Sequence, residues 1–176
     1  MKKLLVVLMT VALFAFPVSG FCLDLSEMTF GVNGGITWPL GDLDDAEADM
    51  GFTFGGQALM PSGIMDELSF GGLLNYVTMD GDDWEDKTSI IEILPKARYT
   101  FADTGDFQIF GEVGVGLFRW DNDDDDGMEI GLALGGGVKI AENMEVLGTY
   151  KRFKVDEDDL DMDVEYIAIT FGYYFY

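Results

Sequence analysis

Carboxylates are the side chains of this chain with the most evident capacity for chemistry. Its 176 residues include 33 aspartates and glutamates against 10 lysines and arginines, and the formal net charge is −23. Most of the acidic residues fall in four short segments, 41–49, 80–86, 121–127 and 155–163. Hard divalent cations prefer oxygen ligands such as these. The third segment is therefore a candidate Ca²⁺ or Mg²⁺ site, formed by Asp121, Asp123, Asp124, Asp125 and Asp126.

This acidic run is similar to the opening of an EF-hand loop, but it lacks the rest of that motif. The twelfth position counted from Asn122 is Ala133 instead of a glutamate, and the flanking segments have the pattern of strands. The prediction is therefore a loose cation site. The alternative is a solvated acidic surface that binds no ion and repels neighbouring molecules. No other cofactor is predicted.

Several classes of activity are disfavoured by composition. The chain has no histidine, which removes Ser–His dyads and triads and histidine-ligated metal sites. We therefore expect no enzymatic activity and assign no catalytic residue. Nucleic acid is not an expected partner, because phosphate binding needs a basic surface. Cys22 is the single cysteine, so no intrachain disulfide can form.

A second set of charges lies within the apolar segments and alternates with large apolar residues. Successive side chains of a strand point to opposite faces, so these charges share the faces opposite the apolar ones. If those faces enclose a narrow space, opposite charges can pair across it and replace water. We therefore predict ion pairs inside a barrel among Glu92, Lys96, Arg98, Glu112, Glu129, Lys139 and Lys151.

The elements that must position these residues are strands. Alternation with a clear apolar face predicts eight of them, at about 28–39, 50–60, 67–79, 88–101, 107–120, 128–140, 144–154 and 164–176. An ordinary antiparallel sheet with one solvated face would explain each strand singly. It explains the whole set poorly, because no helix is predicted to cover the apolar faces. A bilayer admits only helices and closed barrels, so the pattern favours a transmembrane barrel.

The connections between the predicted strands alternate in character. Short turns such as Pro61–Gly63 and Ala141–Asn143 alternate with the acidic segments, an asymmetry typical of outer-membrane barrels. An even strand number puts both termini in the periplasm and the acidic loops outside. Aromatic residues at strand ends are expected to form interfacial girdles: Trp38, Phe52, Phe101, Phe107, Trp120, Tyr173 and Phe175. Pro95 lies mid-strand, where we expect a bulge or a shifted strand start.

The N-terminus has the pattern of a secretory signal peptide. Lys2 and Lys3 precede an apolar run at 4–16, and small residues follow at 18–20. We predict cleavage after Gly20, which leaves residues 21–176 as one barrel domain. A lipid anchor on Cys22 is not expected, because Phe21 occupies the position that lipoprotein processing reserves for a small residue.

The C-terminal segment carries the last strand and its aromatic end. Alternation over Val164–Tyr176 puts Phe171, Tyr173 and Phe175 on one face. With the signal peptide, the eight alternating segments and the closing Gly172-Tyr173-Tyr174-Phe175, the chain resembles the small outer-membrane β-barrel superfamily of outer membrane proteins A, X and W. The resemblance implies an all-β fold, an eight-stranded antiparallel up-and-down transmembrane β-barrel, located in the outer membrane.

The same resemblance implies partners for the C-terminus. Phe171, Tyr173, Phe175 and Tyr176 are similar to the family's assembly signal, which usually stops on the aromatic residue that Phe175 would supply; here Tyr176 follows. The implied partners are outer-membrane lipids and the barrel-assembly machinery, and the expected state is a monomer. Function does not follow from the fold.

Three functional classes remain open at this point. The first is a structural or surface-interaction barrel whose acidic rim meets divalent cations or a basic partner. The second is a narrow pore; eight strands argue against it, whereas glycines on the inner faces favour it because they leave space (Gly31, Gly35, Gly71, Gly114, Gly116, Gly131, Gly135 and Gly137). The third is a soluble periplasmic barrel that holds an apolar ligand, which requires the apolar faces inside and the charges outside.

Overall fold

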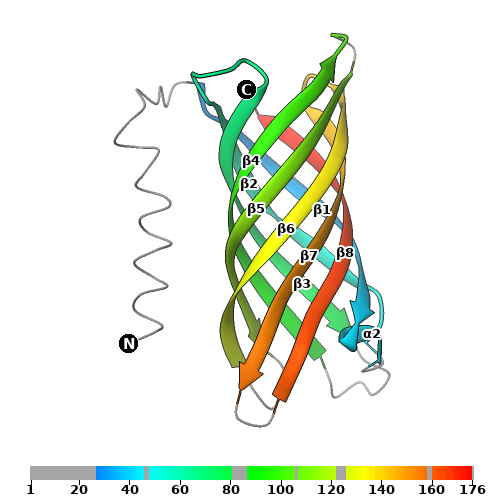
Figure 1. Ribbon diagram of the computed structural model, residues 1–176. Helices are drawn as coiled ribbons and strands as arrows, with labels where there is room; N and C mark the ends of the chain where they lie inside the picture. The colour runs from blue at the N-terminus through cyan, green and yellow to red at the C-terminus, as the bar shows by residue number, and fades with distance from the viewer. Residues whose placement is uncertain are drawn as a thin grey trace.

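The computed structural model describes residues 27–45, 48–80, 87–105, 107–121, 126–157 and 160–175. The signal-peptide prediction for residues 1–20 lies outside this range. The described chain forms eight strands and one short helix (Figure 1). They are β1 (Thr29–Gly41), α2 (Asp42–Asp45), β2 (Gly51–Pro61), β3 (Leu68–Asp80), β4 (Lys87–Asp103), β5 (Gln108–Asp121), β6 (Asp126–Ala141), β7 (Met144–Glu157) and β8 (Leu160–Phe175).

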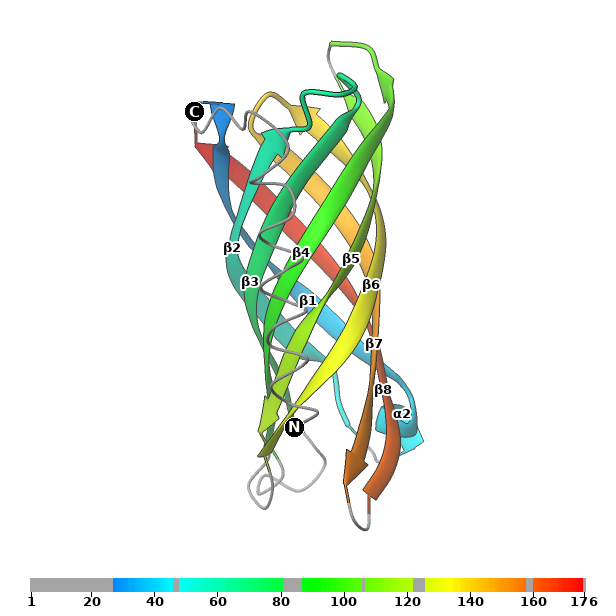
Figure 2. The same cartoon turned by 60° about the vertical axis from the view of Figure 1, so that its left-hand side comes forward.

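The eight strands make a closed up-and-down antiparallel barrel. Each strand pairs with its neighbour in sequence, and β1 pairs with β8 to close the sheet (Figure 2). The closing pairs run from Phe30↔Phe175 to Gly41↔Val164. Closure leaves no continuous sheet edge, which is the condition for a sheet to cross lipid. The connections after β2, β4 and β6 lie at one end, here called the turn end, and those after β1, β3, β5 and β7 at the other, the loop end.

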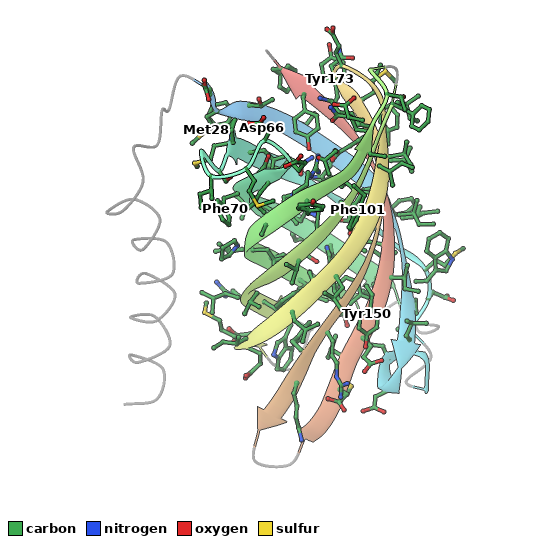
Figure 3. All side chains as sticks on the ribbon, turned by 45° about the horizontal axis from the view of Figure 1, so that its top comes forward. Met28, Asp66, Phe70, Phe101, Tyr150 and Tyr173 are labelled. Carbon is green, nitrogen blue, oxygen red and sulfur yellow. The ribbon has the colours of Figure 1, made fainter. Side chains whose placement is uncertain are left out.

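The two faces of the barrel wall differ in chemistry, as the alternation predicts. Large apolar side chains face outward, among them Phe52 with 63% of its surface exposed and Phe101 with 68%. Phe101, Tyr150 and Tyr173 are among the outward residues that Figure 3 labels. Glu92, Lys96, Arg98 and Lys151 are buried on the opposite face. This arrangement contradicts the alternative of a soluble barrel, which needs charges outside and apolar faces inside.

Pro95 does not produce the expected bulge or shifted strand start. Pro95 lies opposite Gly72 in an unbroken β3–β4 register, and the β4–β5 pairs on either side of it, Ile93↔Leu117 and Lys96↔Gly114, share one register. The irregularity of β4 falls instead between Thr100 and Ala102. The missing proline N–H therefore interrupts pairing locally without inserting a residue.

The loop end carries the one element that the sequence pattern did not predict. Asp42–Asp45 form a single helical turn after β1, and Leu43 on this turn is buried against the interior. The backbone N–H of Asp163 in β8 donates to Asp42 Oδ2 at 2.8 Å, which ties the turn to β8. Among the described residues, no helix is long and apolar enough to span a membrane.

Candidate functional site

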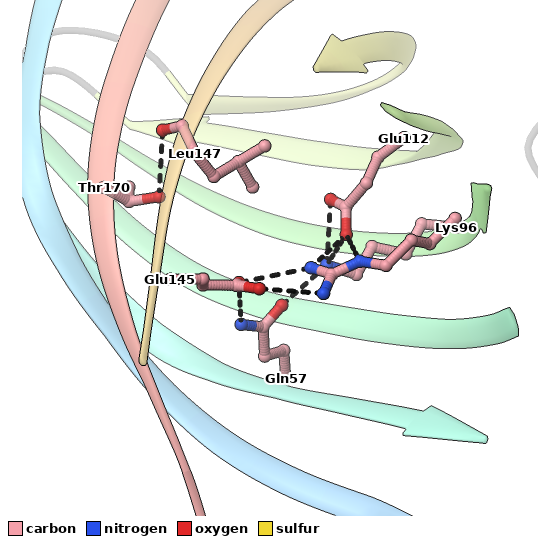
Figure 4. A network of polar contacts seen from close by, with 7 residues as sticks. Gln57, Lys96, Glu112, Glu145, Leu147 and Thr170 are labelled. Atoms are coloured by element: carbon pink, nitrogen blue, oxygen red, sulfur yellow. Dashed lines mark hydrogen bonds and ion pairs between the residues drawn. The ribbon is translucent and has the colours of Figure 1, made fainter. Parts of the chain in front are cut away.

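The turn-end half of the barrel interior contains a network of buried charges from four strands (Figure 4). Lys96 Nζ on β4 donates to Glu112 Oε1 on β5 at 2.9 Å and to Gln57 Oε1 on β2 at 2.6 Å. Arg98 Nε donates to Glu112 Oε1 at 2.6 Å, and its Nη1 to Glu145 Oε2 on β7 at 2.8 Å. Gln57 Nε2 donates to Glu145 Oε1 at 2.8 Å, which completes a ring of contacts across the lumen.

A second buried pair lies on the other side of the network, nearer the loop end. Lys151 Nζ on β7 contacts both carboxylate oxygens of Glu92 on β4, at 2.7 and 2.6 Å. The phenol of Tyr166 on β8 also donates to Glu92. Lys151 and Glu92 side chains are 2% and 0% exposed, so each charge depends on its partner for compensation.

The remaining two predicted interior charges lie on β6. Lys139 is near the turn end, with its Nζ 5.9 Å from the centroid of the Tyr174 ring. Glu129 lies toward the loop end, opposite Phe118 in the β5–β6 register. The structure therefore brings five of the seven predicted residues into two close groups and places Glu129 and Lys139 at different levels of the wall.

Sequence reasoning missed two members of these groups as site residues, Glu145 and Tyr166. Glu145 bonds both Arg98 and Gln57, and Tyr166 bonds Glu92. The signal that could have identified them is the alternation itself. Glu145 shares the inward face of β7 with Thr149 and Lys151, and Tyr166 shares that of β8 with Ala168 and Thr170.

The loop-end half of the interior is filled by apolar side chains, which the sequence analysis did not anticipate. Phe118 on β5 and Phe153 on β7 stack with ring centroids 4.9 Å apart. Around them pack further buried residues from six strands and α2: Leu43, Val77, Met79, Ile90, Leu94, Trp120, Ala133, Val155, Val164 and Tyr166. The expectation that Trp120 belongs to an outer girdle is wrong. Trp120 is only 6% exposed, because its even position in β5 points it inward.

The interior leaves little free space. A cavity of about 20 Å³ lies between the two halves, next to Lys96, Glu112 and Leu94. That volume holds about one water molecule. At the turn end a hollow of about 150 Å³ reaches inward as far as Arg98 and Tyr174.

The inward glycines do not supply the space expected of them. A Cβ on Gly35 would lie 2.0 Å from the backbone oxygen of Ile169, and one on Gly116 would lie 2.1 Å from that of Ile93. One on Gly137 would lie 2.6 Å from Phe110 Cζ. These glycines permit close approach of strands and rings, so they add no channel.

The predicted cation site is described only at its two ends. Asp121 and Asp126 face each other as the last β5–β6 pair, and Arg119 Nη2 lies 3.5 Å from Asp126 Oδ2 on the exposed surface. Asp123, Asp124 and Asp125 lie outside the described residues. In the part of the chain that the structure describes, no group of three or more acidic or cysteine side chains is arranged to hold a metal ion.

One carboxylate outside the membrane-spanning segments has a displaced pKa. At the β4–β5 turn, the backbone N–H of Gly105 donates to Asp103 Oδ1 at 2.8 Å, and Gln108 Nε2 donates to Oδ2 at 2.6 Å. These two hydrogen bonds favour the ionised carboxylate and lower the pKa of Asp103, with a smaller contribution from Lys139.

The residues of the predicted assembly signal line the outer surface of β8. Phe171, Tyr173 and Phe175 are 46%, 39% and 54% exposed, and the Tyr173 and Phe175 rings meet edge to face at 5.3 Å. Tyr176 lies outside the described residues. The aromatic surface therefore sits at the turn end, beside the strand pair that closes the barrel.

Comparison with known proteins settles the family. The outer membrane protein β-barrel domain matches residues 4–175. The chain belongs to that family. This outer-membrane β-barrel is accordingly a protein of the outer membrane, in contact with its lipids. No match was found among curated protein sequences.

Two solved structures illustrate how far the fold is shared. Neisserial surface protein A is 14% identical, with a TM-score of 0.60 over 84% of this chain and 96% of that one. The N-terminal β-barrel domain of Pseudomonas aeruginosa OprF is 15% identical, with a TM-score of 0.50 over 84% of this chain and 97% of that one. At such identities the likeness concerns the barrel fold alone.

Proposed function

We propose that this outer-membrane β-barrel is a closed, non-conducting barrel with a structural or surface-interaction role. The observation that supports this most is the blocked interior. The charge network around Lys96 and Arg98 and the apolar cluster around Phe118 and Phe153 occupy successive levels of one narrow lumen. An eight-stranded barrel has an interior that side chains fill, so a continuous water path is not expected.

The proposed interactions are at the loop end, outside the cell. Antiparallel up-and-down topology gathers all four acidic connections at this end, and they contain most of the 33 acidic residues. Such a surface repels anions and concentrates cations. Its proposed partners are Ca²⁺ or Mg²⁺, with Asp121, Asp123, Asp124, Asp125 and Asp126 as ligands, or a basic partner. The proposal assigns no catalytic activity.

The first experiment measures conductance in a planar bilayer, with the protein purified from outer membranes and its insertion verified. We expect no reproducible current steps, with or without calcium, because no open path crosses the interior. Regular steps would overturn the proposal in favour of a narrow pore. Block of those steps by calcium would then place the acidic loops at the mouth of that pore.

A calorimetric calcium titration tests the loop-end part separately. We expect binding that weakens in a variant with Asp123→Asn, Asp124→Asn and Asp125→Asn. The matched control neutralises three acidic residues of the turn end, with Asp66→Asn, Glu67→Gln and Glu142→Gln, and should bind like the wild type. Absence of binding at millimolar calcium, or equal weakening in both variants, would contradict the cation site.

A further inference from the structure

The pairing of β6 with β7 ends before either strand does. It runs from Ala141↔Met144 up to Gly131↔Phe153. Beyond that pair, β6 continues through residues 126–130 and β7 through residues 154–157. Among the described residues, these two extensions pair only with β5 and β8, respectively. Figure 2 shows β7 and β8 diverging from β6 at their lower ends. We call the unpaired stretch between the two extensions the β6–β7 seam.

Each side of the seam is a strand edge with unused hydrogen-bonding groups. Along a strand, the backbone N–H and C=O groups of successive residues point alternately to its two edges. In residues 126–130 of β6, one set of these groups therefore points to β5 and the other into the seam, where the described chain supplies no strand. Such an edge is a template for an added strand.

The unpaired backbone also fixes the level of the seam in the membrane. Backbone groups without partners are very costly in hydrocarbon, so the two extensions must lie in the headgroup layer or beyond it. The seam is at the loop end, which the proposed function places outside the cell. A segment of an extracellular partner can therefore reach this edge through water.

The outer surface beside the seam has room and apolar contacts for an added strand. A hollow of about 290 Å³ lies where β7 leaves β6, with Gly131 and Phe153, the last pair, among its lining residues. Met128 and Ile130 on the β6 extension point outward and are 52% and 48% exposed. Apolar side chains of an added strand would pack beside these two, because cross-strand neighbours on one face are in contact.

The charge around the seam selects the kind of strand that binds there. The connection at 121–127 leads into β6, and the connection at 155–163 joins β7 to β8. Together they contain eleven acidic residues and no basic one. This charge attracts a basic segment and repels a second copy of the same acidic chain. The β6 edge is the better side, because its extension contains Asp126 and Glu129 and no base, whereas that of β7 begins with Lys154.

We propose that the β6 edge of the seam binds an extended, basic segment of a partner protein, which joins the barrel sheet as a strand antiparallel to β6. The inference rests on the proposed function, since it states how a basic partner binds at the loop end. The added strand takes the place that β7 leaves. Its backbone pairs with residues 126–130, and its basic side chains lie near the two acidic connections.

A pair of synthetic peptides tests the backbone part of this proposal. The intact barrel is placed in phosphatidylcholine nanodiscs with EDTA, and a peptide of alternating lysine and valine is titrated by calorimetry, with empty nanodiscs as the blank. The control peptide has the same sequence and charge but N-methylated backbone amides. We expect it to bind at least about tenfold more weakly, because N-methylation removes the donors that pair with β6.

Two barrel variants test the charge part. Asp123→Asn with Asp124→Asn and Asp125→Asn neutralises the connection next to the β6 edge and should weaken binding of the unmodified peptide. The matched control, Asp82→Asn with Asp83→Asn and Asp86→Asn, removes the same charge from the connection between β3 and β4, neither of which borders the seam. It should bind like the wild type. Equal weakening in both variants would contradict a site at the seam.

Amide hydrogen exchange locates the bound peptide. At saturation we expect exchange in residues 126–130 to slow about tenfold, whereas residues 132–138 of β6, which pair with strands on both sides, should not change. Slow exchange at 126–130 without peptide would overturn the proposal, since β7 or a second copy would then occupy the edge. Equal binding of both peptides would also overturn it while leaving a basic partner of the rim in place. Binding of neither would remove that partner too.

Discussion

At the scale of single residues, we expect substitutions of buried charges to change the free energy of unfolding most. Glu92 has no exposed surface, and its partners Lys151 and Tyr166 are almost equally buried. The Coulombic attraction in such a pair does little more than offset the cost of desolvating both groups. Removing one member is different, because the other charge stays buried without compensation. We therefore expect the pair to constrain which strands can meet more than it raises stability.

The substitution Lys151→Met tests this reasoning. We expect it to destabilise the folded barrel by about 3–5 kcal/mol in urea unfolding from lipid vesicles. The double variant Glu92→Leu with Lys151→Met removes both charges and should recover a large part of that loss. Arg119→Gln is the exposed control, since its ion pair with Asp126 is half exposed, and should change stability by less than about 1 kcal/mol. A single variant as stable as this control would contradict the argument.

At the scale of elements, glycine determines how closely strands pack. Gly116 on β5 lies against β4, where an added Cβ would be 2.1 Å from the carbonyl oxygen of Ile93 and 2.9 Å from Leu94 Cα. Both are backbone atoms, so no side chain can rotate to give room. The β4–β5 pair would have to separate there.

Gly116→Ala should therefore cost about 1–3 kcal/mol, in the range of overpacking substitutions. Gly72→Ala on β3 is the matched control, because a Cβ there would meet nothing within 4 Å. The free energy of unfolding in vesicles compares the two variants directly. If both variants unfold at the same urea concentration, the close approach of β4 and β5 at Gly116 is not required.

At the scale of the whole molecule, closure of the barrel joins its first and last strands. The β1–β8 pairs bring residues near both ends of the described chain together, so closure requires nearly the whole chain. The outward aromatics Tyr173 and Phe175 lie where this closing pair reaches the turn end. We propose that they form the signal read by the barrel-assembly machinery.

Deletion of Phe175 and Tyr176 should lower the yield of heat-modifiable barrel in cells several-fold. Phe175→Ala, which keeps the backbone pair with Phe30, should show most of the same loss if the ring is what is recognised. Phe54→Ala is the control, because Phe54 is an outward aromatic with 59% exposure on β2, a strand that does not pair with β8. Normal yields of both β8 variants would contradict the assembly-signal proposal, and equal loss in all variants would indicate a general need for outer aromatics.

Alternation in the sequence alone determined the strands and their faces. A period of two is a local property, so it predicted the eight strands to within a few residues and the outward position of residues such as Phe52 and Phe101. The same local argument placed Glu92, Lys96, Arg98 and Lys151 on inward faces. It would also have placed Trp120 and Glu145 inward had it been applied at the strand ends.

Only the tertiary structure decided which inward residues meet. Glu145 and Arg98 are 47 residues apart in the chain and bond because the register of a closed barrel brings β4 and β7 to the same level across the lumen. The division of the interior into a charged half and an apolar half has the same origin, since each half combines residues from distant strands. The tertiary structure also decided where the pairing of β6 with β7 ends. Both strands continue beyond Gly131↔Phe153 with ordinary strand patterns, but beyond that point they do not pair with each other.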